Sequence, residues 1–375
     1  MRVAAFNVEN LFNRPTVFDD SNSKVADAIL AAAAELSKIF EKETYTAADK
    51  ARMLTLMKTL GILNKDDGKF VWLRKIRGKL ITRPQSGKPS IAATGRGSWI
   101  GWLEYKTQTV NETAIYNTGR VIRDVGADVL AVVEAENRIT LKLFSEAVLQ
   151  HVNKEAGTSV SYDEVMLIDG NDDRGIDVGV MTRNGHAITS MRSHVQDMYG
   201  KERLFSRDCP VYSIRTPSGE TVHVLPNHLK SKFGGNDSKS QAKREAQATR
   251  VAVIYRELVA AGQRNVIILG DMNDTPDSAP LKPLLKDTDL RDVSHHPGFD
   301  TGPYPGKGTF GPGTDGNKID YILLSPALFS RIEACGLFRK GCYPGKKPKW
   351  PVYDTLTGEL HAASDHHLIW ADINI

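Results

Sequence analysis

Seven short segments of the chain are nearly continuous runs of hydrophobic residues, many of them β-branched. We predict that they are strands, over residues 2–8, 128–133, 177–182, 221–225, 266–269, 319–324 and 368–373. Strands without a polar face are typical of sheets that other layers cover on both sides. Longer amphipathic patterns predict helices over residues 112–125, 141–152 and 239–261. The alternation indicates an α/β or α+β protein in which sheets and helices form layers.

The pattern changes in residues 21–105. Two helical patterns follow each other there, over residues 25–40 and 47–60. Thr46 and Asp49 have the spacing of a capping box, and Gly61 is placed to end the second helix. We therefore expect a single domain over residues 1–375, into which residues 21–105 are inserted as a helical and β-hairpin segment.

The composition is that of an ordinary folded protein. Of 375 residues, 41% are hydrophobic and 25% are charged, which excludes a disordered chain. No apolar run approaches the ~18 residues of a membrane helix, so we expect no insertion into a membrane. Residues 2–8 already predict a strand, so we expect no signal peptide and a cytoplasmic protein, unless an export signal has been removed. Cys209, Cys335 and Cys342 lack the spacing of a disulfide framework or a zinc site, and we expect reduced, buried thiols.

Positive charge is concentrated in one part of the chain. The net charge is only +4, but residues 65–106 contain ten basic and three acidic residues. Aromatic residues lie among them, at Phe70, Trp72, Trp99, Trp102 and Tyr105. Such a mixture can stack nucleic-acid bases and pair with phosphates. It is also typical of a β-hairpin whose aromatic residues pack on the core while Lys and Arg face water, and both interpretations stay open. A second basic group consists of Arg339, Lys340, Lys346, Lys347 and Lys349.

Short polar clusters follow or begin the predicted strands. They are Asn7 with Glu9, Glu134, Asn227 with His228, Asp271 with Asn273, Asp320, and Asp365 with His366. Loops at strand ends are where catalytic groups gather, although any one cluster could equally cap a helix or tie a loop. Together they offer oxygen and imidazole ligands without cysteine, which suits Mg²⁺ or Mn²⁺ better than a structural zinc. Since the chain has neither a GxSxG nor a GxxxxGK[ST] motif, the clusters predict metal-dependent hydrolysis of phosphate esters.

Five motifs in the chain occur in the order of a known superfamily. They are FNVEN, VVE, NHLKSK, GDMND with KIDYIL, and SDHH. At these residues the sequence resembles the endonuclease/exonuclease/phosphatase superfamily, which includes pancreatic deoxyribonuclease, abasic-site endonucleases, sphingomyelinases and inositol polyphosphate phosphatases. The resemblance covers residues 1–13 and about 110–375. It implies a DNase I-like fold, a four-layer α/β/β/α sandwich with the active site at one edge, where strand ends converge.

The resemblance also implies roles for the metal-binding and catalytic residues. Glu134 corresponds to the principal metal ligand, Asn7 beside it is expected to contact the metal or the phosphate of the substrate, and Asp365 and Asp271 are expected to assist in metal binding. His366 corresponds to the general base that takes a proton from the attacking water.

A second group of residues supports these roles. Asp320 is expected to hold the tautomer of His366. Asp271 and Asn273 match a pair that positions the water and the phosphate. Either Asp271 or His366 removes the proton in members of the family, and the sequence leaves this choice open.

Further residues are expected to contact the substrate. His228 corresponds to a histidine that contacts the phosphate and assists the leaving oxygen. Arg174 is a candidate phosphate clamp, oriented by Asp177, although Asp177 could equally form a plain salt bridge at a strand edge. Asn227 and Lys230 are candidate contacts to the substrate.

Two departures from the superfamily pattern matter. Some members have Asp where this chain has Glu9, so a metal-ligand role for Glu9 is only an alternative. The interval between Asn7 and Glu134 is far longer than in the family. Because both residues should converge on one metal, we expect residues 21–105 to leave and re-enter the fold near the catalytic face and to form a wall or lid over the substrate. His295, His296 and His367 are expected to be structural or exposed.

The leading function is that of a Mg²⁺-dependent nuclease that cleaves DNA or RNA without sequence specificity, so nucleic acid is the expected partner and protein partners are unknown. The same residues would serve a phosphatase or phosphodiesterase that acts on inositol phosphates or phospholipid head groups. A third alternative is a binding module that has kept the fold and lost the chemistry.

Overall fold

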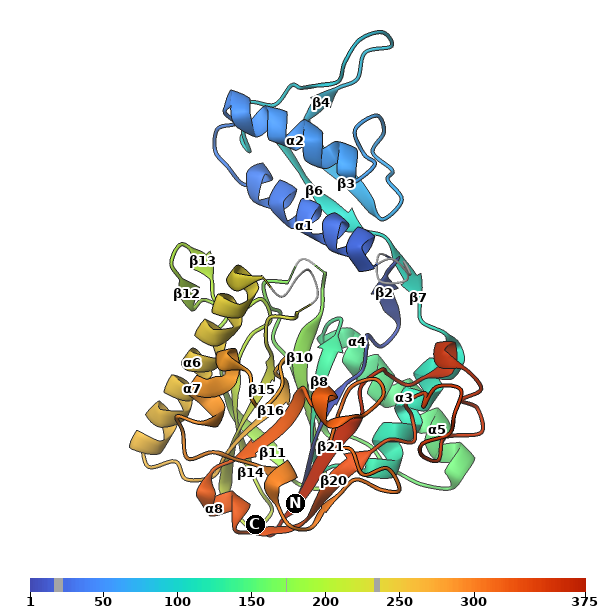
Figure 1. The fold of residues 1–375 in the computed structure, drawn as a ribbon, viewed down its shortest axis with the longest axis vertical. Coiled ribbons are helices and arrows are strands. Elements are labelled where there is room, and N and C mark those ends of the chain that lie inside the picture. Colours follow the sequence, from blue (N-terminus) through green and yellow to red (C-terminus); the bar gives the residue numbers. More distant parts are fainter. Residues whose placement is uncertain (17–22, 173, 233–236) are drawn as a thin grey trace. The chain divides into compact units, whose positions relative to one another are not determined.

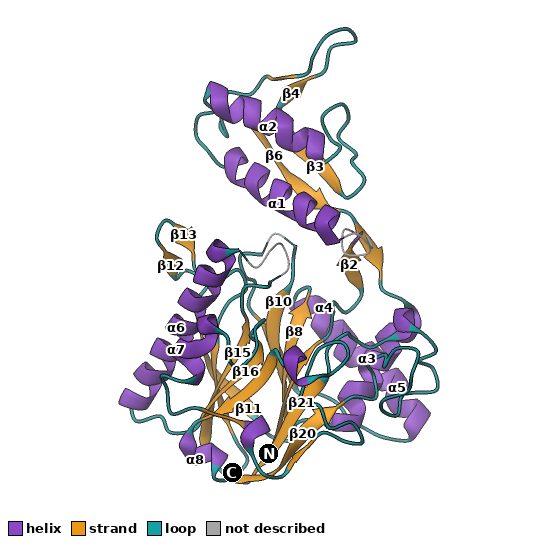
Figure 2. Cartoon of the chain, viewed as in Figure 1, coloured by secondary structure: helices purple, strands orange, loops and turns teal. Residues whose placement is uncertain are grey.

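The computed structural model describes residues 1–16, 23–172, 174–232 and 237–375, and the chain forms two compact units (Figures 1 and 2). Of the described residues, the core unit comprises Met1–Phe12, Val110–Lys232 and residues 237–375. The helix–hairpin unit comprises Asn13–Thr109. Residues 21 and 22, with which the predicted insertion begins, lie outside the described residues.

Two sheets form the centre of the core unit. The first has seven strands, in the order β18 (Phe299–Asp300), β20 (Ile332–Phe338), β21 (Leu368–Ile373), β1 (Arg2–Asn7), β8 (Val129–Ala135), β10 (Asp177–Thr182) and β9 (Glu164–Leu167). The second has six, in the order β11 (Ala187–Arg192), β14 (Val211–Arg215), β15 (Thr221–His228), β16 (Val266–Asp271), β19 (Asp320–Leu324) and β17 (Arg291–Asp292). A separate small pair consists of β12 (Met198–Tyr199) and β13 (Glu202–Arg203).

Helices cover the outer faces of both sheets (Figure 2). Those on the seven-stranded sheet are α3 (Glu112–Val125), α4 (Arg138–Leu143), the π-helical turn η2 (Phe144–Val148) and α5 (Leu149–Ala156). Those on the six-stranded sheet are α6 (Ser238–Ala260), η3 (Ala279–Leu281) and α7 (Lys282–Leu285). The remaining short helices are η4 (Val293–His295), η5 (Asp315–Asn317), α8 (Pro326–Phe329) and η6 (Glu359–His361).

The alternation of side chains along the strands explains the layers. On β1, Val3 and Ala5 belong to the buried cluster between the two sheets, whereas Ala4 and Phe6 belong to the cluster beneath the helices. Successive side chains of a strand point to opposite faces, so a strand that is apolar at every position must be covered twice. The core unit is therefore the four-layer α/β/β/α sandwich that the sequence predicted.

The predicted elements of the core unit are present, with two differences. The helix predicted over residues 141–152 is a longer helical segment that contains the π-helical turn η2. Strands β9, β11, β14 and β20 were not predicted. The three cysteines are buried thiols without a disulfide, as expected. None of the described helices combines the length and the apolar character that are needed to cross a bilayer.

The helix–hairpin unit packs two helices against a β-hairpin. Its elements are β2 (Asn13–Pro15), α1 (Ser23–Phe40), α2 (Ala47–Thr59), β3 (Val71–Gly78), β4 (Ile81–Thr82), β5 (Ser90–Ile91), β6 (Trp99–Tyr105) and β7 (Thr107–Thr109). Thr46 and Asp49 form the predicted capping box of α2. Gly61, with a φ of 71°, follows the end of this helix as predicted, since a left-handed backbone favours glycine.

This unit has a hydrophobic core of its own. The buried Trp99 ring lies edge-on to Phe40, with ring centroids 4.9 Å apart, and its Nε1 donates to the hydroxyl of Tyr45 at 3.0 Å. Phe70 is buried as well, whereas 46% of the surface of Trp102 is exposed. Packing on the core therefore accounts for Phe70 and Trp99, but not for Trp102.

Candidate active site

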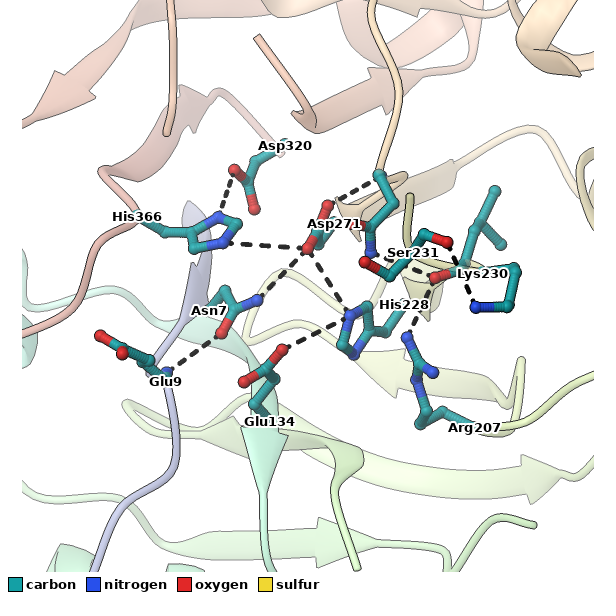
Figure 3. Close-up of polar contacts among 12 residues, drawn as sticks. Asn7, Glu9, Glu134, Arg207, His228, Lys230, Ser231, Asp271, Asp320 and His366 are labelled. Carbon is teal, nitrogen blue, oxygen red and sulfur yellow. Dashed lines mark hydrogen bonds and ion pairs between the residues drawn. The ribbon is translucent and has the colours of Figure 1, made fainter. Parts of the chain in front are cut away.

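The registers of the two sheets bring the predicted site residues to one end of the sandwich. In the seven-stranded sheet β1 and β8 are parallel, and Asn7 lies beside Val133, one residue before Glu134. In the six-stranded sheet His228 of β15 pairs with Asp271 of β16, and Asp271 pairs with Asp320 of β19. Functional groups from both sheets thus meet in a single cluster (Figure 3).

Asp271 lies at the centre of this cluster, and 2% of its surface is exposed. Its carboxylate accepts hydrogen bonds from the side-chain amide of Asn7 at 3.3 Å and from the backbone N–H of Asn273 at 2.8 Å. The same carboxylate is 3.6 Å from Nε2 of His228 and 4.0 Å from Nε2 of His366. Four of the predicted site residues therefore surround one carboxylate.

His366 is fixed through both its side chain and its backbone. Its Nδ1 is 2.8 Å from Oδ2 of Asp320, which leaves Nε2 facing Asp271. Its backbone N–H donates to the hydroxyl of Ser364 at 2.9 Å, and this hydroxyl donates to the carbonyl oxygen of Asn7 at 2.7 Å. The neighbouring His367 instead packs edge-on against Trp350, outside the cluster.

Glu134 and Asp365 complete the acidic lining of the cluster. Glu134 Oε1 is 3.6 Å from Nε2 of His228. Asp365 Oδ1 is 3.7 Å from Nε2 of His366. Nδ1 of His228 is buried and has no hydrogen-bond partner among the described residues, so the protein itself does not explain its position.

Four residues at this end of the sandwich have a left-handed backbone although they are not glycine. The φ angles are 50° at Glu9, 68° at Asn10, 68° at Glu134 and 55° at Asn273. Glu134 lies at a register shift between β8 and β10, because Asp177 pairs with Ala135 and Val178 pairs with Val133. A β-bulge changes the direction in which a side chain points. Each left-handed backbone conformation at a residue other than glycine costs about 1–3 kcal/mol. Backbone strain is therefore concentrated where the predicted functional groups lie.

Arg174 is held by a partner that the sequence did not predict. Asp172 accepts two hydrogen bonds from its guanidinium, at 2.8 and 2.7 Å, and a third from Arg207 at 3.0 Å. Asp177, the predicted partner, accepts from the backbone N–H of Gly170 at 2.8 Å. The assignment of the orienting role to Asp177 was therefore wrong, because the bulge beside β8 turns this carboxylate toward the Gly170 backbone.

Arg207 was not among the residues predicted for the site. Only 2% of its surface is exposed, and its second amino group donates to the carbonyl oxygen of Leu229 at 3.0 Å. It thus ties Asp172 to the end of β15, beside His228 (Figure 3). No motif surrounds Arg207, and its partners are far away along the chain, so only its burial reveals it.

The two remaining candidates for substrate contacts differ. The side-chain amine of Lys230 donates to the carbonyl oxygen of Ser231 at 3.3 Å, and burial together with the positive charges of Arg207 and Arg174 lowers its pKa to about 8. Asn227 is buried, and its amide donates to the carbonyl oxygen of Leu225 on its own strand at 3.0 Å. Of these two side chains, Lys230 is therefore the one that is better able to contact a substrate.

Crowding of charges shifts the pKa values of the cluster. Burial and repulsion by Asp320 raise the pKa of Asp271 to about 7, and burial also raises the pKa of Glu134. Burial alone would lower the pKa of His366, but nearby carboxylates, Asp320 foremost, hold it well above its ordinary value. Burial and the charge of Arg207 keep the pKa of His228 well below its ordinary value.

The donor set suits a divalent cation. Carboxylates that are driven toward protonation by burial and mutual repulsion become stable as anions when a cation lies among them. Asp271, Asp320 and His366 offer ligand atoms within 4.8 Å of one another, and Glu134 adds a further oxygen donor nearby. Because His366 Nδ1 already contacts Asp320, the pair is better placed to orient the imidazole than to bind an ion. Oxygen donors of this kind are the ligands that hard cations prefer.

Two sheets between helices, with carboxylates and imidazoles converging at one end, define an enzyme that hydrolyses phosphoric esters. Residues 91–334 match the model of the Endonuclease/Exonuclease/phosphatase family, and the chain belongs to this family, whose members generally use divalent metals. No curated protein sequence matches the chain.

Several solved structures resemble this one at low sequence identity. Truncated TDP2 from Caenorhabditis elegans has a TM-score of 0.45 and 16% identity, over 69% of this chain and 89% of that chain. The mannosyl-6-phosphatase of Bacteroides thetaiotaomicron has a TM-score of 0.47 and 15% identity, over 69% and 90%. The human Nocturnin catalytic domain has a TM-score of 0.47 and 15% identity, over 71% and 88%.

Proposed function

We propose that the protein is a nuclease that hydrolyses phosphodiesters in DNA or RNA without sequence specificity and that it depends on Mg²⁺, for which Mn²⁺ can substitute. The observation that carries the proposal is the convergence of Asn7, His228 and His366 on the buried carboxylate of Asp271. These groups offer a base, an acid and anion-binding donors within a few ångströms of one another, as direct attack by water on a phosphodiester requires.

His366 acts on the attacking water in this proposal. A cation among the surrounding carboxylates would offset the charges that raise the pKa of His366, and the contact with Asp320 then favours the neutral tautomer that carries the proton on Nδ1 and leaves Nε2 to accept one. The carboxylate of Asp271 faces the same nitrogen at 4.0 Å, so either group can receive the proton first. Asn273, whose backbone holds Asp271, helps to position the water and the phosphate.

His228 and Arg174 act on the phosphate. His228 is kept neutral by its low pKa, so its Nε2–H can donate a hydrogen bond to the negative charge that develops on the leaving oxygen, and that oxygen takes its proton from water. The bidentate contact with Asp172 holds the planar guanidinium of Arg174 in one orientation, which favours recognition of a phosphate. Asn227 and Lys230 are proposed to contact the substrate chain beside them.

Glu134 would hold the metal, with Asn7, Asp365 and Asp271 as further ligands. A divalent cation bound there supplies charge stabilisation for the phosphate and lowers the pKa of a bound water. The left-handed backbone at Glu134 supports this role, because strain of this kind persists where a side chain must be aimed. We also propose that residues 21–105 are an addition to a single catalytic domain and form a wall or lid over its substrate.

A substrate panel tests the proposal. Plasmid DNA, single-stranded RNA, inositol polyphosphates and phospholipid head groups are each incubated with the enzyme in Mg²⁺ and in EDTA. We expect cleavage of the nucleic acids in Mg²⁺ only, with none by His366→Ala. Release of phosphate from inositol polyphosphates with intact plasmid and RNA would instead identify a phosphatase, and no metal-dependent turnover at all would identify a binding module.

A further inference from the structure

The β-hairpin of the helix–hairpin unit has one buried and one exposed face. Val71 and Leu73 of β3 are buried in the core of this unit. The residues between and after them, Trp72 and Arg74, point to the other face, because side chains alternate along a strand. Trp72 pairs with Glu104 and Arg74 with Trp102, so the four side chains share a surface. We call these four residues the hairpin face.

The planar side chains of Trp72 and Arg74 on the hairpin face are held in place by contacts within the protein. The guanidinium of Arg74 lies over the Trp72 ring, 4.5 Å from its centroid, and donates two hydrogen bonds to Glu104, at 2.6 and 2.9 Å. The amine of Lys106 approaches the same ring at 5.2 Å. Indole rings and fixed guanidinium planes are the surfaces on which unpaired nucleic-acid bases stack.

Further cations lie next to the hairpin face: Arg77 pairs with Ile100 and so shares the side of Trp102, and Lys79 follows the end of β3, whereas Lys75 pairs with Gly101 and points to the other side. The acidic residues between positions 65 and 106 each pair with a cation: Asp66 with Arg83 at 2.7 Å, Asp67 with Lys106 at 2.5 Å, and Glu104 with Arg74 at 2.6 Å. The exposed residues Lys75, Arg77, Lys79 and Lys88 have no ion-pair partner among the described residues. The surplus positive charge therefore lies at the end of β3, in the segment before β4 and between β4 and β5, where it is complementary to a polyanion.

We infer that the hairpin face binds single-stranded nucleic acid, with bases stacked on Trp102 and on the Arg74–Trp72 layer and with phosphates at Arg77 and Lys79. This inference rests on the proposed function for the choice of polymer. A duplex keeps its bases stacked inside and cannot use the flat groups. An anionic membrane is disfavoured because charged Arg74 and Glu104 separate the two indoles, which leaves no continuous apolar surface.

Fluorescence anisotropy with the full chain tests the base contacts. A labelled oligothymidylate of about 12 nucleotides is titrated in EDTA, so that no cleavage occurs. Trp102→Ala should weaken binding at least about fivefold, whereas Trp102→Phe should keep most of the affinity. Tyr199→Ala, which removes another exposed aromatic ring in the core unit, is the matched control and should bind like the wild type. Equal affinity of Trp102→Ala and this control would overturn the inference.

The salt dependence tests the phosphate contacts. Reversing two charges, in Arg77→Glu combined with Lys79→Glu, should reduce the slope of log Kd against log salt by roughly 1.4. The control Lys282→Glu with Lys286→Glu changes the net charge equally, at exposed positions of the core unit, and should leave the slope as it is. An unchanged slope in the first variant would contradict the inference.

Two further comparisons separate this inference from its rivals. If Trp102→Ala weakened binding to phosphatidylglycerol vesicles but not to the oligonucleotide, the hairpin face would be a lipid site and the inference would be wrong. Oligonucleotide binding that depends on Trp102 supports the inference even if the substrate panel finds no nuclease activity. The experiments therefore test the binding of nucleic acid to the hairpin face and the proposed nuclease activity separately, and either hypothesis can be wrong without the other.

Discussion

Asp320 and His366 are in contact although they come from different sheets of the sandwich. Asp320 begins β19 of the six-stranded sheet, and His366 precedes β21 of the seven-stranded sheet. The 2.8 Å contact between Oδ2 and Nδ1 therefore depends on how the two sheets pack. The hydrophobic cluster between the sheets thus sets the orientation of the proposed base.

Asp320→Asn should impair turnover without unfolding the protein. Asparagine keeps the shape of the side chain but removes the charge that stabilises the imidazolium and selects its tautomer, so we expect kcat to fall roughly 10²-fold or more. The melting temperature should stay within a few degrees of the wild type. Steady-state kinetics and a thermal melt measure both quantities.

The control for this prediction is Asp289→Asn. Asp289 accepts a hydrogen bond from Tyr255 at 2.6 Å, outside the cluster, so the same change there should leave kcat intact. Full activity of Asp320→Asn would show that His366 does not depend on this carboxylate.

Glu134→Gln should make the protein more stable and less active. Because burial raises the pKa of Glu134, its ionised form costs stability near neutral pH in the absence of metal, and a neutral amide removes this cost. The loss of an anionic ligand should raise the Mg²⁺ concentration for half-maximal activity at least about tenfold. Melting in EDTA and a Mg²⁺ titration test the two effects.

Glu146→Gln provides the comparison for Glu134→Gln. Glu146 is exposed and pairs with Lys142 at 3.5 Å, so its substitution should change neither the metal requirement nor the stability by much. If Glu134→Gln retained the Mg²⁺ requirement of the wild type, Glu134 would not be a ligand.

Much of the site could be predicted from sequence, since its residues follow strands that hydrophobic runs reveal. Asn7, Glu134, His228 and Asp271 each lie at or one residue from the end of an observed strand that the pattern predicts, although β15 and β16 extend to His228 and Asp271, beyond the predicted ends at residues 225 and 269. Arg207 could not be found in this way, because its contact with Asp172 bridges 35 positions and depends on tertiary packing alone.

The error at Asp177 has a related cause. Arg174 lies three residues before Asp177, ahead of β10, and the Asp177 carboxylate beside the register shift between β8 and β10 instead accepts a hydrogen bond from the backbone of Gly170. A bulge of this kind leaves no clear pattern in the hydrophobic positions. Several strands were not predicted, among them β9, β11, β14 and β20. They carry more polar residues on one face or lie at the edges of the sheets, where the β-propensity of the residues is a weak guide.

Asp177→Asn should stabilise the protein by an amount that grows as the pH rises from about 4 to about 7. Burial raises the pKa of Asp177 from 3.8 to about 7, so the folded state binds the proton more tightly than the unfolded state. The wild type therefore loses stability as the pH rises from about 4 to about 7, and asparagine, which imitates the neutral form, does not. At pH 8 the variant should gain about 4 kcal/mol in the free energy of unfolding, because each unit of pKa shift corresponds to about 1.4 kcal/mol.

Urea unfolding at pH 5 and pH 8 tests the prediction for Asp177. The gain of the variant over the wild type should be larger at pH 8 than at pH 5. Asp163→Asn, at an exposed position before β9, should follow the wild type at both values. A constant difference between Asp177→Asn and the wild type would show that titration of this carboxyl is not the cause.

The core unit should fold without residues 13–109. The backbone N–H of Val110 donates to the carbonyl oxygen of Phe12 at 2.8 Å, so a short glycine–serine linker can join these residues without moving either one. The shortened chain should unfold cooperatively and hydrolyse a small phosphodiester such as bis(p-nitrophenyl) phosphate, but it should bind oligothymidylate more weakly. Circular dichroism and anisotropy measure these outcomes. A shortened chain that does not fold would mean that the two units are one cooperative structure.

The left-handed backbone at Glu134 and Asn273 sets a limit on how such a protein can be improved. Glycine at either position would relax the chain and remove a functional side chain at the same time. Selection for tolerance to heat would therefore favour changes there that selection for turnover rejects. Laboratory evolution of variants with higher thermal stability should therefore introduce substitutions elsewhere in the sandwich and keep Glu134 and Asn273 unchanged.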